Sequence, residues 1–233
     1  MHFVGPDQLH GFEKRLTSDL YPSDFEWTAD WEATGFEGAT DIRMLTRSGI
    51  CARSVQIDYD DEVTHRAVRE LYDVARSADT RPFFMHVSYT HPHDPYLCKR
   101  EHWNRYEGLD VPPPRVEYLG EGNADPHSLR VLQQHGLAGA EVPEDVVMRA
   151  RRAYYGSVSY IDDQVGALVE ALRTSGMAEN TVIIFSSDHG EMLGERGLWL
   201  KKTFFEQALR VPLIINAPGR FKPGRVREFA SLL

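Results

Sequence analysis

The chain has 233 residues, of which 42% are hydrophobic and 26% charged, and its formal net charge is −9. This is the composition of an ordinary globular protein, and the acidic balance argues against a protein that binds nucleic-acid backbones. The apolar runs at 181–185 and 211–215 are too short to cross a bilayer. No leader pattern opens the sequence, and Cys51 and Cys98 are too few for a disulfide framework, so we expect a cytoplasmic protein.

The first half of the sequence predicts irregular structure, then a helix, then a strand. Residues 1–57 are rich in aromatic residues, Gly and Asp and show little helical period. A helix capped by Asp60 or Asp61 is predicted next, because apolar residues recur at helical spacing through Val74. The apolar run at 81–90 predicts a buried strand, whose His86 is interpreted as a hydrogen-bonded core histidine.

The second half predicts a long helix between further strands. Residues 91–143 form an excursion broken by Pro and Gly, within which Asp125 can cap a short helix ending at Gly136. Apolar residues stepping by three and four predict a helix over 145–175, and short strands are predicted at 181–187 and 211–218. This order predicts an α/β sandwich with a largely buried sheet.

Two of the predicted strands end in polar stretches. "HPHDPY" follows the strand at 81–90, and "DHGEMLGERG" follows the strand at 181–187. Ligands of open α/β sheets bind outside the carboxyl ends of the strands, so we expect these stretches to meet at one edge of the sheet.

These stretches contain candidate ligands for a cation and an anion, each with a plainer alternative. Asp188 and His189 could bind one divalent cation if the chain turns at Gly190. Alternatively, Asp188 caps a turn and His189 is a half-buried, hydrogen-bonded histidine. Two histidines and two lysines could bind an anion, or they could be turn histidines and solvated lysines. They are His91, His93, Lys201 and Lys202.

Three other patterns invite a function but favour a structural interpretation. Asp162 and Asp163 lie on the predicted long helix and are interpreted as part of a solvent-exposed face. Cys51, in "CARS", has no base or helix start beside it. The third pattern is an aromatic cluster made up of Phe25, Trp27, Trp31 and Phe36. Such a cluster more often serves packing than ligand recognition, although aromatic residues with acids would suit a quaternary ammonium.

Taken together, four stretches resemble the sulfatase family of the alkaline-phosphatase superfamily, with the closest likeness to its choline-sulfatases. They are the opening "MHFVG", "PFFMHVSYTHPHDPY", the helix "YYGSVSYIDDQVGALVEAL" and "FSSDHGEMLGERGLWLKKTFFEQALRVPLIINAPGRF". The resemblance covers nearly the whole chain. It implies an alkaline-phosphatase-like α/β sandwich with a central, mostly buried mixed sheet flanked by helices.

The resemblance also implies roles for individual residues. His2 matches the histidine of a Gly-Lys-x-His-x-Gly motif that contacts the sulfate and the nucleophile, and His93 rather than His91 matches the histidine of the sulfate pocket. Lys201, in preference to Lys202, matches the lysine that binds the sulfate ester. The metal ligands implied are Asp188 and His189, and Trp27 lies where choline-sulfatases place an aromatic against the trimethylammonium group.

The sequence departs from the family pattern in what it lacks. Sulfatases use a cysteine or serine in a Cys/Ser-x-Pro/Ala-x-Arg motif, oxidised to formylglycine, and neither this motif nor the family's Asp-Asp metal pair is present. We therefore expect residues 1–233 to be a partial, single catalytic domain truncated at both ends, without its N-terminal strand and C-terminal region. The chain alone is expected to be inactive.

The implied function is hydrolysis of choline sulfate, a small molecule, to choline and sulfate, with no nucleic-acid or membrane partner. The expected cofactor is a divalent metal, Ca²⁺ first and Mn²⁺ or Mg²⁺ as alternatives, with formylglycine in the full-length enzyme. The alternatives are a phosphonate monoester hydrolase or phosphodiesterase of the same superfamily, or a non-catalytic remnant. Whether a full-length protein forms a homo-oligomer stays open.

Overall fold

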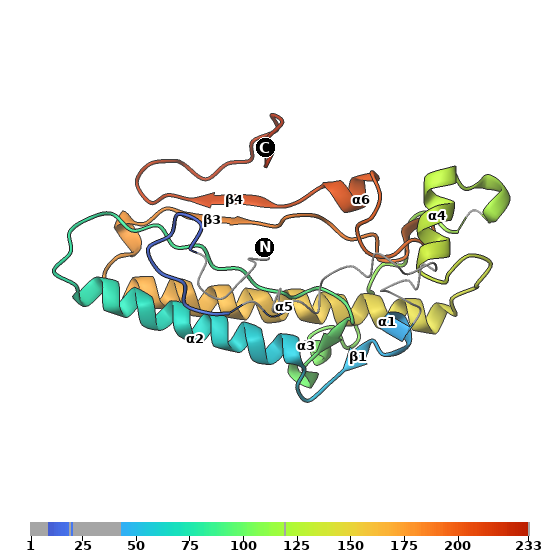
Figure 1. Ribbon diagram of the computed structural model, residues 1–233, viewed down its shortest axis with the longest axis horizontal. Coiled ribbons are helices and arrows are strands. Elements are labelled where there is room, and N and C mark those ends of the chain that lie inside the picture. Colours follow the sequence, from blue (N-terminus) through green and yellow to red (C-terminus); the bar gives the residue numbers. More distant parts are fainter. Residues whose placement is uncertain (1–8, 19, 21–42, 119, 233) are drawn as a thin grey trace, which may run out of the picture.

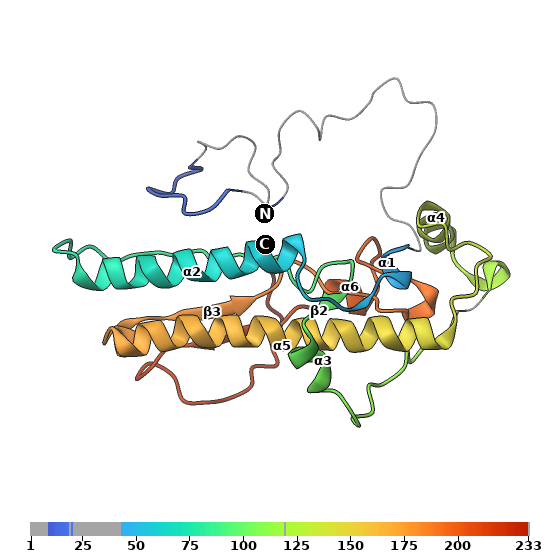
Figure 2. The ribbon, with the colours of Figure 1, turned by 90° about the horizontal axis from the view of Figure 1, so that it is seen from below.

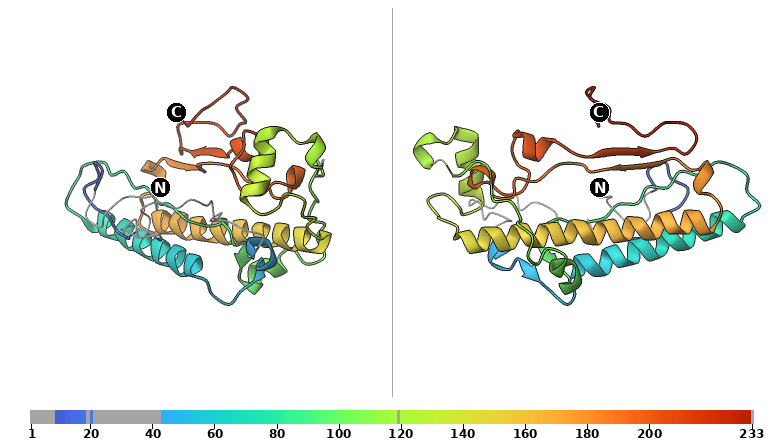
Figure 3. Two further views of the ribbon diagram at one scale, coloured as in Figure 1. Left: turned by 45° about the vertical axis from the view of Figure 1, so that its right-hand side comes forward. Right: turned by 180° about the vertical axis from the view of Figure 1, so that it is seen from behind.

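The computed structural model describes residues 9–18, 20, 43–118 and 120–232. Two long helices form one layer, a two-stranded hairpin forms another, and an extended segment at 82–89 runs between them (Figures 1 and 3). This is an α/β arrangement, as the sequence predicts. Among the described residues, no helix is both long enough and apolar enough to span a membrane.

The first long helix is α2 (Val55–Arg76). It begins five residues before the predicted cap, because the Ser54 hydroxyl accepts a hydrogen bond from the Ile57 N–H at 3.1 Å. The prediction of Asp60 or Asp61 as the cap is therefore wrong, and both lie inside the helix. The apolar face of α2, which includes Val63 and Leu71, is buried.

The second long helix is α5 (Glu144–Thr174), which agrees with the prediction to within one residue at each end. It runs alongside α2 (Figure 2), and Gly176, with φ of 75°, follows its end. Its side chains also hydrogen-bond to segments that precede and follow it in the sequence. Ser157 donates to the Leu97 carbonyl at 3.1 Å, and Arg151 donates to the Leu193 carbonyl at 2.6 Å.

The described sheets are both two-stranded. β1 (Gly49–Ile50) pairs in parallel with β2 (Leu97–Cys98), and β3 (Ile183–Ser186) pairs antiparallel with β4 (Leu213–Asn216). All four residues of β4 are exposed. The exposure follows from the layering, because the two long helices lie on the far side of the extended segment from the hairpin (Figure 1).

The segment predicted as a buried strand at 81–90 is extended but belongs to no ladder of the described part of the chain. Its side chains alternate: Met85, Val87 and Tyr89 are half-buried, whereas Phe84 is 79% exposed. Only one face of the segment is therefore covered by described residues, which explains why the expected burial is not seen here.

The remaining described elements are short. The predicted helix after Asp125 is present, and the Asp125 carboxylate accepts from the N–H groups of His127 and Ser128 at 3.0 Å. The helices are α1 (Arg43–Thr46), α3 (Arg100–Asn104), α4 (Pro126–Gln134), α6 (Glu206–Leu209), and the 3₁₀ turns η2 (Glu121–Asn123), η3 (Ala178–Asn180) and η4 (Glu195–Gly197).

The main core packs the first half of α5 against two loops. Tyr96, Met192 and Trp199 are almost fully buried there, together with Ala150 and Ala153 of α5. Tyr96 follows the "HPHDP" stretch and Met192 follows Asp-His-Gly. The same core therefore anchors both of the polar stretches singled out in the sequence.

Candidate active site

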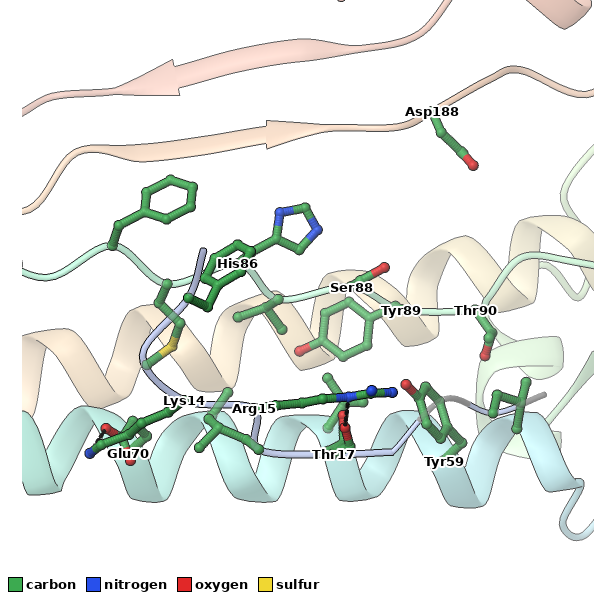
Figure 4. A pocket seen from close by; sticks show the side chains of 18 of the residues that line it. Lys14, Arg15, Thr17, Tyr59, Glu70, His86, Ser88, Tyr89, Thr90 and Asp188 are labelled. Carbon is green, nitrogen blue, oxygen red and sulfur yellow. Dashed lines mark hydrogen bonds and ion pairs between the residues drawn. The ribbon is translucent and has the colours of Figure 1, made fainter. Parts of the chain in front are cut away.

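Two loops that are far apart in the sequence line one cavity of about 790 Å³. We call residues 90–95 the histidine loop and residues 187–191 the Asp-His-Gly loop. Figure 4 shows Asp188 projecting from the end of β3 toward the segment that carries His86 and Ser88. The two polar stretches therefore share a cavity, although the segment that leads into the histidine loop belongs to no described sheet.

His93 and Lys201 are in direct contact in this cavity. Nζ of Lys201 lies 3.1 Å from Nε2 of His93. Nδ1 of His93 lies 2.9 Å from the Asp94 carboxylate and 3.0 Å from the Asp94 carbonyl oxygen. Because Nδ1 faces two acceptors it carries a proton, so Nε2 of the neutral ring accepts a hydrogen bond from Lys201.

The charges around His93 favour its protonated form. The Asp94 carboxylate, 2.9 Å from Nδ1, raises the pKa of His93 above its ordinary value, although burial and the charge of Lys201 oppose this effect. Burial alone would raise the pKa of Asp94, but His93 and Lys201 outweigh it and that pKa is lowered. Protonated His93 and Lys201 would be two adjacent donors that repel each other, and an oxyanion accepting from both would relieve the repulsion.

Asp188 and His189 present two candidate metal-ligand atoms close together on their loop. Nδ1 of His189 donates to the Gly190 carbonyl at 2.8 Å, which leaves Nε2 as the acceptor, 3.6 Å from Oδ2 of Asp188. The Asp188 side chain is 79% exposed. Within the described ranges no group of three or more potential ligands gathers, so these two residues fit part of a divalent-cation shell.

Gly190 allows the Asp-His-Gly loop to run against the chain beside α6. A Cβ atom at Gly190 would collide with the Gln207 carbonyl oxygen and lie 2.9 Å from the Arg210 carbonyl oxygen. The Gly190 N–H donates to the Ala208 carbonyl at 2.7 Å. The turn after Asp188 and His189 therefore requires glycine for close backbone approach rather than for an unusual φ.

The neighbours of the contacting pair are engaged elsewhere. His91 is buried, and its Nδ1 lies 2.7 Å from the buried Asp60 carboxylate. Lys202 is exposed, and its carbonyl accepts from Nε2 of His127 at 3.0 Å. Of the two candidate histidines and the two candidate lysines, the structure thus brings together His93 and Lys201.

Three other candidates have different outcomes. His2 and Trp27 lie outside the described residues. His86 is exposed and has no hydrogen-bond partner in the described ranges, so its interpretation as a hydrogen-bonded core histidine is wrong. Its side chain lies on the uncovered face of the extended segment (Figure 4).

The structure supports the structural interpretation of the cysteines and of the helix acids. Burial raises the pKa of Cys51 and raises that of Cys98 to about 12, which leaves neither thiol activated. Asp163 is 45% exposed and pairs with His102 at 2.9 Å and Arg105 at 2.6 Å.

Two carboxylates of the site, Asp94 and Glu191, are not among the residues predicted from the sequence. Asp94 orients the His93 ring, and its position directly after that histidine was the available signal. Glu191 accepts hydrogen bonds from the backbone N–H groups of Leu193 at 3.2 Å and Leu200 at 2.6 Å. Burial raises the pKa of Glu191. Its carboxylate closes the loop that ends beside Lys201, a contact that no spacing rule reveals.

Comparison with known proteins gives one consistent result. The family model described as Sulfatase matches residues 9–233. The chain is 45% identical over 225 residues to a choline-sulfatase of Rhizobium meliloti, covering 94% of this chain and 44% of the relative. It is 35% identical over 175 residues to the human iduronate 2-sulfatase, covering 69% of this chain and 31% of the relative. The chain therefore spans less than half the length of these relatives.

A solved structure shows the same fold. The phosphonate monoester hydrolase SpPMH from Silicibacter pomeroyi superposes with a TM-score of 0.63 at 22% identity, covering 83% of this chain and 39% of that structure. At this identity the likeness concerns the fold, and it supports the predicted alkaline-phosphatase-like α/β class.

Proposed function

Because the chain belongs to the sulfatase family, we propose that it is part of a sulfuric ester hydrolase that converts choline sulfate and water into choline and sulfate. One observation carries the proposal: Lys201 contacts His93 in the same cavity that Asp188 and His189 line. We propose further that residues 1–233 form one partial catalytic domain.

The chain's own residues would bind and neutralise the sulfate group. Lys201 and protonated His93 present adjacent donors for two sulfate oxygens, and Asp94 holds the His93 ring in place. Cleavage of a sulfate ester releases an alkoxide, so donors already aimed at the sulfate lower the barrier as negative charge develops.

Asp188 and His189 would hold a divalent metal, which we expect to be Ca²⁺, with Mn²⁺ and Mg²⁺ as alternatives. When bound, the metal supplies positive charge to the sulfate oxygens. The family's formylglycine nucleophile has no counterpart in the 233 residues, so no residue of this chain is assigned that step.

Choline as the leaving group is supported by the 45% identity with a choline-sulfatase over 94% of the chain. A fixed trimethylammonium charge is recognised by aromatic faces and by acids. We assign the aromatic contact to Trp27, and the net charge of −9 is compatible with a cationic substrate.

The test is sulfate release from choline sulfate by two polypeptides, the 233-residue chain and the longest in-frame extension that its gene encodes. We expect activity only in an extension that supplies a Cys/Ser-x-Pro/Ala-x-Arg motif. Trp27→Ala should lower turnover of choline sulfate more than that of an uncharged aryl sulfate, which serves as the control substrate. Sulfate release by the 233-residue chain alone would overturn the assignment of the nucleophile to residues outside it.

A phosphonate monoester or phosphodiester is the second candidate substrate, because the fold is shared with a phosphonate monoester hydrolase. The same extended polypeptide should be assayed on both ester classes. A higher kcat/KM for the phosphorus esters would replace the sulfatase proposal.

A further inference from the structure

The histidine loop is held by two buried polar side chains on one face of α2. Gln56 is 5% exposed and Asp60 is fully buried, and they are four residues apart, so they lie on the same side of the helix. Buried polar groups carry a desolvation cost unless they are fully hydrogen-bonded. Both side chains form hydrogen bonds with residues of the histidine loop.

Asp60 holds the start of the loop. Its Oδ1 accepts from the Thr90 N–H and hydroxyl, both at 2.8 Å. Its Oδ2 accepts from the His91 N–H at 3.0 Å and lies 2.7 Å from Nδ1 of His91. One carboxylate thus takes four hydrogen bonds from two consecutive residues, which fixes both the backbone and the His91 ring.

Gln56 holds the end of the loop. Its Nε2 donates to the Asp94 carbonyl at 2.7 Å. Nδ1 of His93 lies 3.0 Å from the same carbonyl oxygen, so Gln56 fixes an acceptor that orients the His93 ring. The His93 N–H also donates to the Thr90 carbonyl at 3.0 Å, which joins the two ends of the loop.

We infer that Gln56 and Asp60 are positioning residues for the reaction. Their hydrogen bonds fix both ends of the histidine loop and so hold His93 against Lys201. The inference rests on the proposed function for its effect on turnover. Its structural part concerns only the geometry of His93.

The physical reason for requiring these two side chains is their hydrogen-bonding chemistry. An amide at position 60 would replace one carboxylate oxygen with an NH2 group that faces two of the four donors and cannot accept from them, so Asn cannot replace Asp60. Met at position 56 keeps the length of glutamine but offers no donor to the Asp94 carbonyl. Displacing a reacting group by about 1 Å can cost on the order of a hundredfold in rate.

The test uses Asp60→Asn and Gln56→Met, with Asp61→Asn as the matched control. Asp61 lies on the same helix, but its carboxylate accepts from the Tyr160 hydroxyl at 2.7 Å and makes no described hydrogen bond to the histidine loop. The titration of His93 is followed by ¹⁵N NMR of the histidine side chains in the 233-residue chain. Turnover of choline sulfate is measured in the active extended polypeptide.

Both variants should shift the His93 titration midpoint toward its ordinary value and lower kcat/KM at least about tenfold, whereas the control changes neither. The milder Gln56→Met variant keeps the test decisive if Asp60→Asn does not fold. Folded variants with the wild-type His93 midpoint would overturn the inference, whatever their activity. A shifted midpoint in a protein that releases no sulfate from any ester would uphold the structural part of the inference and refute the proposed function.

Discussion

Lys201 Nζ lies 3.1 Å from His93 Nε2, although 108 residues separate them in the sequence. The Lys201 ammonium can only donate a hydrogen bond, because it has no lone pair. It therefore needs an acceptor, which Nε2 of His93 provides only when the imidazole is neutral. The contact is a hydrogen bond when His93 is neutral and a repulsion when it is protonated. Its energy therefore depends on pH and on whether an anion is bound.

The first prediction concerns anion binding at this pair. Asp94 raises the pKa of His93, so the imidazolium persists to a higher pH than that of an ordinary histidine. Sulfate should bind most tightly below this pKa and lose affinity as the pH rises through it. The measurement is a ¹⁵N NMR titration of His93 with and without sodium sulfate, in which sulfate should raise the midpoint.

The variant Lys201→Met tests the direction in which Lys201 shifts the titration of His93. Removing the ammonium should raise the His93 midpoint in the absence of sulfate, because the charge of Lys201 lowers it. The same change should weaken sulfate binding. Lys202→Met is the control and should leave both quantities unchanged. A lower midpoint in Lys201→Met would contradict the assigned contact.

The second prediction concerns Asp188 and His189 as the proposed metal ligands. In an extended polypeptide that releases sulfate, Asp188→Ala and His189→Ala should each lower the metal content and abolish most of that release. A chelator should do the same to the wild type, with recovery greatest on adding Ca²⁺ rather than Mn²⁺ or Mg²⁺. Metal content is measured by mass spectrometry of the purified protein. Asp162→Ala is the control, and retention of the full metal content by either site variant would refute the assignment.

The third prediction concerns two glycines of α5 that should respond in opposite directions. A Cβ atom at Gly156 would lie 2.6 Å from Cys98 Sγ, whereas a Cβ at Gly166 meets nothing within 4 Å. Gly156→Ala should therefore lower the free energy of unfolding by about 1–3 kcal/mol. Gly166→Ala should raise it by up to about 1 kcal/mol, since alanine is the better helix former.

Urea unfolding followed by circular dichroism at 222 nm measures both changes. Adding Cys98→Ala to Gly156→Ala should recover part of the loss, because it removes the sulfur atom that the new methyl group meets. Equal destabilisation by the two glycine substitutions would show that α5 and β2 do not approach as closely as described.

The fourth prediction concerns His135, which is 1% exposed and has no hydrogen-bond partner for either ring nitrogen in the described part of the chain. Burial and the charge of Lys202 lower its pKa from 6.5 to about 4. The unfolded chain then binds a proton between pH 6.5 and 4 that the folded chain does not, so stability falls as the pH falls through this window.

The protonation of His135 in the unfolded chain lowers the free energy of unfolding by about 3 kcal/mol at pH 4 relative to pH 7. Comparing the wild type with His135→Leu by urea unfolding at pH 7, 5.5 and 4.5 isolates it from other titrating groups. The variant should lose less stability on acidification. Parallel losses in the two proteins would mean that His135 is not buried in its neutral form.

The sequence predicted the elements that rest on local signals. Periodic apolar residues located α5, and Asp125 followed by Pro located α4, because caps and periodicity act within a few residues. The start of α2 was misplaced because two acids resemble a cap, while Ser54 takes that role. Asp60 is instead devoted to a loop 30 residues away, and no local pattern encodes that distance.

The site was predictable in its residue types and less so in its geometry. The spacing of "THPHDPY" and Asp-His-Gly indicated two facing loops, but the choice of His93 over His91 depends on which ring Asp60 engages. Likewise, the Glu191 contacts that close the loop before Lys201 involve backbone N–H groups, which every residue except proline has. Tertiary packing, rather than sequence spacing, decides such contacts.

The placement of α5 between the two loops in the sequence has a consequence for synthesis on the ribosome. At about 5–20 residues per second, Lys201 is made roughly 5–20 s after His93. The histidine loop can dock on Asp60 early, because α2 precedes it. The loop that carries Lys201 is anchored to Arg151 of α5 and follows that helix. A ribosome that stalls after α5 would therefore hold a nascent chain in which the histidine loop can already bind Asp60, whereas His93 still lacks its contact with Lys201.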